Sequence, residues 1–178
     1  PKTVAPHSPA VFRKQITGCR VHRISRRGKY IVFNLSNGQT MLIHLRMTGR
    51  LNWVTRSKIV DKHEHVIIEM GKRQELRFHD TRKFGRIVLT DAPETVLGRL
   101  GPEPLGKQFT AARFIEMLAA RRRQVKPLLL DQTFLAGLGN IYVDEALWKA
   151  GIHPLRQADS LPPKEVGALH RSIRQVLR

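Results

Sequence analysis

Residues 136–151 read Ala-Gly-Leu-Gly-Asn-Ile-Tyr-Val-Asp-Glu-Ala-Leu-Trp-Lys-Ala-Gly. Gly137–Asn140 predicts a tight turn, Ile141–Lys149 a helix, and Gly151 a left-handed cap that ends it. The two glycines of the turn allow the backbone to approach another surface closely, and the first turn of the helix offers unpaired N–H groups to an anion. Asn140 can either cap this helix or donate to a phosphate. An ordinary packing corner between two helices is the alternative interpretation.

Helical periodicity extends to both sides of this turn. A helix capped by Thr110 would bury Phe114, Met117 and Leu118. A second apolar segment covers residues 125–136. A last helix is expected to begin near Pro162-Pro163, because proline is tolerated in a first helical turn, and its apolar residues recur at helical spacing: Val166, Leu169, Ile173 and Leu177. Residues 107–178 are therefore expected to form a helical domain.

The first hundred residues carry the period of two that is typical of strands. Alternating runs over residues 30–35 and 41–47 flank an Asn37-Gly38 hairpin turn. Similar runs follow at residues 66–70, 76–78 and 86–89. The segment Gly101-Pro102-Glu103-Pro104-Leu105-Gly106 then interrupts the pattern like a linker. The sequence predicts an α+β protein, with an antiparallel β-sandwich over residues 1–106 followed by the helical domain.

The charge of the chain points to a polyanionic partner. Lys and Arg number 32 against 14 for Asp and Glu, a formal net charge of +18 over 178 residues. Such an excess destabilises a compact fold by self-repulsion, and binding to nucleic acid is the usual reason for it. Ribosomal proteins and heparin-binding proteins share this trait, so charge alone indicates the class of partner and no more.

Cysteine and histidine usage argues against a metal site. Cys19 is the only cysteine, which excludes an intrachain disulfide and a cysteine-rich zinc site and fits a reducing compartment. His63 and His65 can be combined with His44 or His79, but spacing assigns no third ligand. We expect no bound metal. The sequence also contains no apolar run of about 18 residues that would span a bilayer, and we expect a cytoplasmic protein.

Two kinds of segment are candidates for contact with nucleic acid. Arg26-Arg27-Gly28-Lys29 is a basic cluster suited to phosphates, although it can equally be a solvated turn. Arg121-Arg122-Arg123 with Lys126 forms a second basic cluster, for which a solvated helix end is the favoured interpretation when it is taken alone. Met47 and Phe84 lie beside turns and cations, where an apolar side chain can enter a base stack. The phase of Met47 with Met41, Ile43 and Leu45 favours the alternative, a position in the core.

Several motifs together resemble those of bacterial formamidopyrimidine-DNA glycosylases, within the formamidopyrimidine-DNA glycosylase and endonuclease VIII family. They occur in the family's order over almost the whole chain: Arg26-Arg27-Gly28-Lys29-Tyr30, His44-Leu45-Arg46-Met47-Thr48-Gly49, Lys62-His63-Glu64-His65, Asp80-Thr81-Arg82-Lys83-Phe84-Gly85, Leu100-Gly101-Pro102-Glu103-Pro104-Leu105, Lys126-Pro127-Leu128-Leu129-Leu130-Asp131-Gln132 and Ala136–Leu147. The last run resembles the family's helix–two-turns–helix motif.

The resemblance implies a role for individual residues. Lys29, His63 and Asn140, with Arg82, would contact phosphates near the lesion. Met47, Arg82 and Phe84 would fill the space left by a flipped base, with Arg82 facing the orphaned partner. The implied activity is excision of oxidised purines such as 8-oxoguanine and formamidopyrimidines, followed by cleavage of the abasic site through β- and δ-elimination. The implied partner is double-stranded DNA that contains oxidised bases or abasic sites.

The chain departs from the family pattern at both ends. The family's nucleophile is the amine of an N-terminal proline followed by a glutamate, whereas Lys2 follows Pro1 here. The C-terminal finger that holds the family's one structural zinc has no counterpart either. We expect a fragment that holds no catalytic residue, with Lys29 in a supporting role, no cofactor of its own and no activity alone. We also expect a monomer.

Three functions stay open from the sequence. The leading hypothesis is the DNA-binding body of a glycosylase and AP lyase. The second is a non-catalytic module that grips damaged DNA, and a basic RNA-binding protein is the third. Within the family, a preference of the endonuclease VIII type for oxidised pyrimidines is the alternative to oxidised purines, although Lys126 and Arg82-Lys83-Phe84 favour the purine branch.

Overall fold

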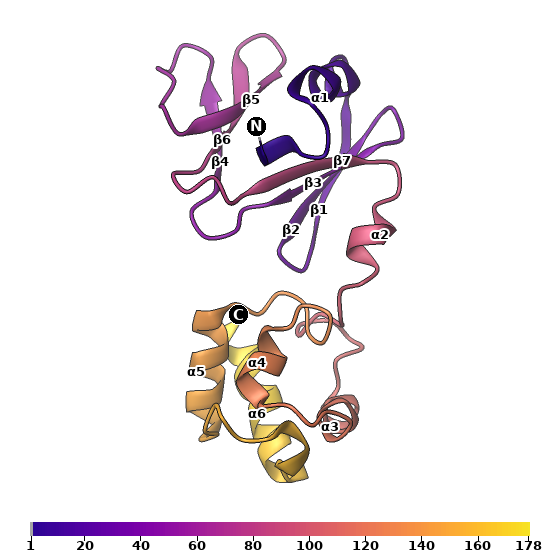
Figure 1. Ribbon diagram of the computed structural model, residues 1–178, viewed down its shortest axis with the longest axis vertical. Helices are drawn as coiled ribbons and strands as arrows, with labels where there is room; N and C mark the ends of the chain where they lie inside the picture. Colours follow the sequence, from indigo (N-terminus) through magenta and orange to yellow (C-terminus); the bar gives the residue numbers. More distant parts are fainter. Residues whose placement is uncertain (1) are drawn as a thin grey trace. The chain divides into compact units, whose positions relative to one another are not determined.

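The computed structural model describes residues 2–178 and divides into two compact units (Figure 1). The first unit ends at Pro93 and the second covers Glu94–Arg178. The segment expected to be a linker, residues 101–106, lies within the second unit. Two hydrogen bonds connect it to the rest of that unit. The Gly101 N–H donates to the carbonyl of Gln132 over 2.9 Å, and the Ala136 N–H donates to the carbonyl of Pro102 over 3.0 Å.

The first unit contains two antiparallel sheets (Figure 1). A four-stranded sheet has the order β1-β2-β3-β7, and its strands are Val21–Arg27, Tyr30–Leu35, Thr40–His44 and Arg86–Thr90. A three-stranded sheet has the order β4-β6-β5, and its strands are Arg50–Thr55, Gln74–His79 and Glu64–Met70. One apolar core takes residues from both sheets, including Phe33, Ile43, Leu76, Phe78 and Ile87. The expected sandwich is therefore present.

Two strands, β1 and β4, were not predicted from the alternation of apolar and polar residues in the sequence. Each is an edge strand of its sheet, and most of its residues are exposed or half-buried. An edge strand with little buried surface needs no regular apolar period, so the pattern that marks an inner strand is missing. Trp53 in β4 is an example, since it is largely exposed.

Two short helices precede the first strand. A short 3-10 helix, η1 (Lys2–Val4), precedes the helix α1 (Pro9–Ile16). Ser8 caps α1 by accepting a hydrogen bond from the Val11 N–H over 3.3 Å. Val4 and Phe12 belong to the core of the first unit. Ser8 and Pro9 favour the start of α1 here, because serine is a preferred N-cap and proline is tolerated in a first helical turn.

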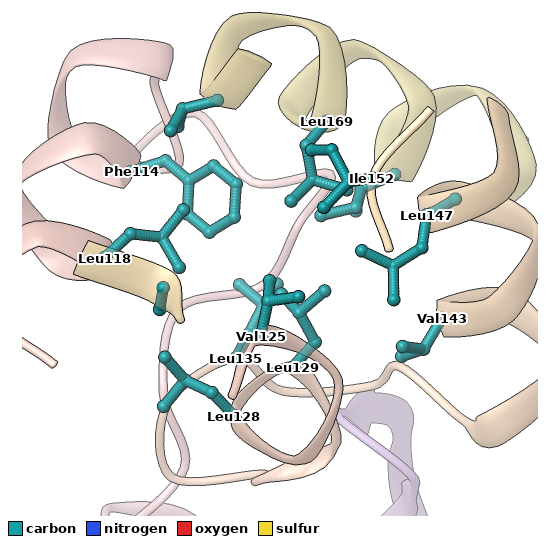
Figure 2. Packing of buried hydrophobic residues seen from close by; sticks show 14 of the residues in the cluster. Phe114, Leu118, Val125, Leu128, Leu129, Leu135, Val143, Leu147, Ile152 and Leu169 are labelled. Atoms are coloured by element: carbon teal, nitrogen blue, oxygen red, sulfur yellow. The ribbon is translucent and has the colours of Figure 1, made fainter. Parts of the chain in front are cut away.

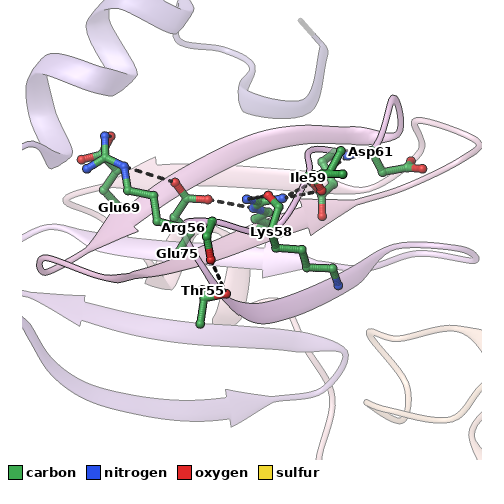
Figure 3. Close-up of polar contacts among 10 residues, drawn as sticks. Thr55, Arg56, Lys58, Ile59, Asp61, Glu69 and Glu75 are labelled. Atoms are coloured by element: carbon green, nitrogen blue, oxygen red, sulfur yellow. Dashed lines mark hydrogen bonds and ion pairs between the residues drawn. The ribbon is translucent and has the colours of Figure 1, made fainter.

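A buried arginine holds the loop that follows β4. Arg77, on β6, is almost fully buried and forms ion pairs of 2.8 Å with both Glu64 and Glu75. Its remaining N–H groups donate to the carbonyls of Lys58 and Ile59 over 2.7 and 3.2 Å. Figure 3 shows Glu75 between this loop and the side chain of Arg56. Every charge of the buried network is paired, as burial requires.

The second unit is helical, as expected. Its elements are α2 (Glu94–Leu97), α3 (Ala111–Ala119), α4 (Val125–Leu130), α5 (Asn140–Ala150), η2 (Ala158–Ser160) and α6 (Pro163–Val176). Thr110 caps α3 by accepting from the Arg113 N–H over 3.2 Å. Gly151 ends α5 in the left-handed conformation with φ of 66°. Figure 2 shows side chains from α3, α4, α5 and α6 meeting in one core, among them Phe114, Leu129, Val143 and Leu169.

The apolar segment over residues 125–136 is longer than the helix that it contains. The helix α4 ends at Leu130, and Asp131 leaves the helical conformation. The Asp131 carboxylate accepts hydrogen bonds from the N–H and the hydroxyl of Thr133, over 3.0 and 2.7 Å. This local side-chain bonding competes with helix continuation. Leu135 and Ala136 are nevertheless fully buried, which explains why the apolar pattern extends beyond the helix.

Candidate nucleic-acid interface

Two turns of the first unit bring Met47, Arg82 and Phe84 together, and we call these three side chains the stacking cluster. Met47 lies between β3 and β4, and the other two lie between β6 and β7. The guanidinium of Arg82 donates to the Met47 sulfur over 3.2 Å and lies 4.7 Å from the centre of the Phe84 ring. Met47 is 71% exposed and Phe84 47%. A position of these two residues in the core is therefore excluded.

Met47 lies outside the core because the strand β3 ends before it. The alternation of the sequence predicts a strand to Met47, but β3 ends at His44. Arg46 adopts a positive φ of 58°, which an extended strand cannot contain. The Gly49 N–H then bonds to the carbonyl of Leu45 over 3.1 Å and closes the turn. The side chain of Met47 projects from the tip of this turn.

Asp80 is the residue of this site that the sequence reasoning missed. It is fully buried and directly follows β6. Its carboxylate accepts from the N–H of Arg82 over 3.2 Å and from that of Gly85 over 2.8 Å. The Thr48 hydroxyl also donates to it, from the other turn. Burial by itself raises the pKa of Asp80, but the hydrogen bonds of Thr48, Gly85, Arg82 and Phe84 outweigh it and lower the pKa. Asp80 is therefore ionised at neutral pH.

A separate group of residues contains Lys29 and Arg46 with His44 between them in the sequence, and we call these three residues the basic group. Lys29 follows Gly28 at the turn between β1 and β2. Its partial burial, and then the charge of Arg46, lower its pKa. Burial, Arg46 and Lys29 together lower the pKa of His44 to about 4. His44 is thus neutral at physiological pH, and its Nδ1 accepts from the Arg46 N–H over 3.0 Å, so the proton must lie on Nε2.

The neighbours of His63 are not those of the basic group, and they include His79. Its ring packs edge-on against His79 with centroids 5.7 Å apart, and His79 approaches the Asp61 carboxylate at 3.4 Å. The backbone carbonyl of His63 accepts from the Asp80 N–H over 3.0 Å. His63 is half-buried, and its contact with a phosphate stays a prediction.

The Gly137–Asn140 turn is held by one glutamine. The Gln132 amide donates to the carbonyls of Leu130 and Leu138 over 2.9 and 3.0 Å and accepts from the Gly137 N–H over 2.9 Å. Gly137 has a φ of 101°, a conformation that glycine adopts readily. Gly139 takes the capping position of α5, and Asn140 is the first residue of the helix. The suggested capping role of Asn140 was therefore wrong, and its exposed side chain stands beside the first N–H groups of α5.

The cations near α4 are partly neutralised. Lys126 forms an ion pair of 2.6 Å with Asp144, and Arg123 one of 3.1 Å with Asp131. The side chain of Arg122 is almost fully exposed and reaches Asp159 only at 3.9 Å. Of the clustered positive charges that the sequence shows here, those of Lys126 and Arg123 are already paired within the unit.

The described residues show neither a metal-binding group nor a membrane segment. Over residues 2–178, no three His, Cys, Asp or Glu side chains gather in a way that would hold a metal ion. Within the same range, no helix is both long and apolar enough to cross a bilayer. The Cys19 thiol is half-buried and donates to the Gln15 carbonyl over 3.3 Å.

Comparison with known proteins agrees with the two units. Residues 1–87 match the model of the formamidopyrimidine-DNA glycosylase N-terminal domain, and residues 100–178 match that of the formamidopyrimidine-DNA glycosylase H2TH domain. The formamidopyrimidine-DNA glycosylase of Herpetosiphon aurantiacus is 47% identical over the whole chain, and that of Protochlamydia amoebophila is 46% identical over 99% of it. The chain spans 66% and 64% of the length of these two relatives.

Solved structures show the same likeness. The formamidopyrimidine-DNA glycosylase of Lactococcus lactis, bound non-covalently to DNA with an abasic site, matches 98% of this chain with a TM-score of 0.89 and 37% identity. This chain covers 68% of it. The same enzyme bound to DNA with a formamidopyrimidine-dG lesion matches with a TM-score of 0.90. The chain belongs to the formamidopyrimidine-DNA glycosylase family.

Proposed function

We propose that this chain is the DNA-binding body of a base-excision-repair glycosylase that flips a damaged base out of the duplex. The observation that carries the proposal is the stacking cluster, in which an exposed thioether, a guanidinium and an aromatic ring meet at one surface. Flipping a base costs a few kcal/mol of stacking and pairing, and the space left behind must be filled. Side chains of these three kinds can stack or hydrogen-bond within a duplex.

The basic group supplies phosphate contacts in this proposal. Lys29 and Arg46 bring positive charge, and neutral His44 offers its Nε2–H as a donor. In the second unit, Asn140 and the first N–H groups of α5 form a separate phosphate site, because the positive end of a helix dipole favours an anion. His63 is a further candidate for a phosphate contact. The net charge of +18 supports this kind of binding.

We propose oxidised purines and formamidopyrimidines as the lesions. The likeness to a glycosylase structure that holds DNA with a formamidopyrimidine-dG lesion supports this choice. Base excision and lyase cleavage of the abasic site belong to the proposed enzyme as a whole. Duplexes carrying an oxidised pyrimidine serve as the contrast, since tighter binding to them would favour the endonuclease VIII type of specificity.

We also propose that residues 2–178 do not supply the nucleophile of the reaction. The family's nucleophilic proline is followed by a glutamate, whereas Pro1, which lies outside the described residues, is followed by Lys2. We therefore expect the 178-residue chain by itself to form no Schiff base with an abasic site. Borohydride trapping on an oligonucleotide with an abasic site measures this, and a strong covalent band through Pro1 would contradict it.

Binding to DNA tests the proposal directly. We expect tighter binding to a duplex with a stable abasic-site analogue than to the undamaged duplex, because the cluster then enters a space that already exists. The logarithm of the affinity should fall by about 0.9 per phosphate neutralised for each tenfold rise in salt. Asn140→Ala should weaken binding to both duplexes, with circular dichroism as the check on folding. Equal affinity for both duplexes, or a flat salt response, would refute the proposed function.

A further inference from the structure

We propose that Asp80 is a positioning residue that holds the stacking cluster in its working arrangement before DNA is bound. The inference rests on the proposed function, because it gives that cluster a role inside the duplex. Asp80 itself is fully buried and can touch no base. Its effect on DNA must therefore pass through the residues that it holds.

The contacts of Asp80 reach both turns that carry the cluster. One carboxylate oxygen, Oδ1, accepts from the hydroxyl of Thr48 and from the N–H of Arg82 over 3.2 Å. The other, Oδ2, accepts from the N–H of Gly85 over 2.8 Å. Thr48 is the chain neighbour of Met47, and Phe84 lies between Arg82 and Gly85. A single side chain is thus hydrogen-bonded to Arg82 and to the chain neighbours of Met47 and Phe84.

The second turn has a conformation that needs such support. Lys83, between Arg82 and Phe84, adopts a φ of 58°, which costs a residue with a side chain about 1 kcal/mol or more. Two N–H groups that flank this residue, those of Arg82 and Gly85, point to one carboxylate. Asp80 therefore stabilises a turn that would otherwise relax, and with it the directions of Arg82 and Phe84.

Ionisation makes this arrangement hard to loosen. A carboxylate has only acceptor positions, and burying it without donors is costly. Opening either turn would leave the buried charge short of a hydrogen bond, so the two turns are coupled through it. A preformed cluster loses less conformational entropy when it enters the duplex, which increases its preference for a damaged site.

Thr48 offers the sharpest test, because it links the two turns without belonging to the cluster. Thr48→Val has nearly the same shape but lacks the hydroxyl, and Thr48→Ser keeps the hydroxyl and serves as the matched control. Asp80→Asn keeps the size of the side chain but presents an amide donor to the backbone donors. Circular dichroism establishes that each variant is folded, and Thr48→Val keeps the test valid if Asp80→Asn does not fold.

The readout is a duplex with a stable abasic-site analogue and 2-aminopurine in the facing position, whose fluorescence reports on the stacking of the orphaned base. At saturating protein we expect the 178-residue chain and Thr48→Ser to give the same fluorescence change. Thr48→Val and Asp80→Asn should give less than half of it. Their preference for the abasic duplex should fall about tenfold, which corresponds to about 1.4 kcal/mol of binding free energy. Affinity for undamaged duplex should change less than twofold.

The outcomes separate this inference from the proposed function. A fluorescence change that Thr48→Val and Asp80→Asn reproduce in full would overturn the role of Asp80 and leave the proposed function standing. The proposed function, and this inference with it, would be overturned if the parent chain gave no fluorescence change. The same conclusion would follow if a Met47→Ala, Arg82→Ala and Phe84→Ala triple variant gave the full change of the parent chain. An equal loss of affinity for both duplexes would show that Asp80 is structural only.

Discussion

Replacing Gly85 by alanine adds a single methyl group at the base of the turn that carries Arg82 and Phe84. That methyl would lie 3.0 Å from Cε1 of Phe78, closer still to its Cζ, and 3.2 Å from the Asp80 carboxylate. Phe78 is 1% exposed and packed in the core of the first unit, so its ring has no space to move into. Overpacking of this kind costs about 1–3 kcal/mol.

This loss of stability should appear as a lower melting temperature of the first unit. One kcal/mol shifts the midpoint of a domain of this size by roughly 4–8 °C, so we expect a decrease of about 4–24 °C. The two tryptophans make the units separately observable, because Trp53 lies in the first and Trp148 in the second. Fluorescence in a Trp148→Phe background follows the first unit, and Trp148 is 86% exposed, so its replacement should cost little.

The matched control is the same substitution in α6. At Gly167 an added methyl meets only a guanidinium nitrogen of Arg171, at 3.6 Å, which is an ordinary contact. Alanine is favoured over glycine within a helix by about 1 kcal/mol, so Gly167→Ala should raise the melting temperature of the second unit, followed through Trp148 in a Trp53→Phe background. An unchanged midpoint for Gly85→Ala would refute the argument from close packing.

Two further predictions concern protonation and the second core. NMR titration of His44 should give a midpoint near 4, because burial and the charges of Arg46 and Lys29 lower its pKa. The unfolded imidazole titrates near 6.5, so the folded chain binds fewer protons than the unfolded chain between about pH 4 and 6.5. His44 should therefore lower the free energy of unfolding as pH falls from about 6.5 to 4. A titration midpoint above 6 would contradict the lowered pKa. Leu129→Ala should destabilise the second unit by about 2–5 kcal/mol, because Leu129 is fully buried in its core. Urea denaturation followed through Trp148 measures the loss, and a change below 1 kcal/mol would show that the core is less closely packed than it appears in Figure 2.

Local signals in the sequence were sufficient for several elements. The helix α5 was expected over Ile141–Lys149 with Gly151 as its cap, and the structure has it over Asn140–Ala150 with that cap. Thr110 caps α3 as expected. Turn residues and caps act within a few residues of the chain, so their effect can be predicted before the tertiary structure is known. The edge strands β1 and β4 could not, because little of their surface is buried. The strand β4 also pairs with β6, which is distant in sequence.

The sequence by itself determined the class of fold, the excess of positive charge and the residue types available for contact with DNA. Only the tertiary structure decided which of those residues meet. Met47 is in phase with core residues, yet it is exposed because β3 ends at His44 and Arg46 turns the chain. Its contact with Arg82 joins residues 35 positions apart. The role of Asp80 is likewise non-local, because a buried carboxylate is stable only where donors from separate turns converge on it, and that convergence is a property of the folded chain.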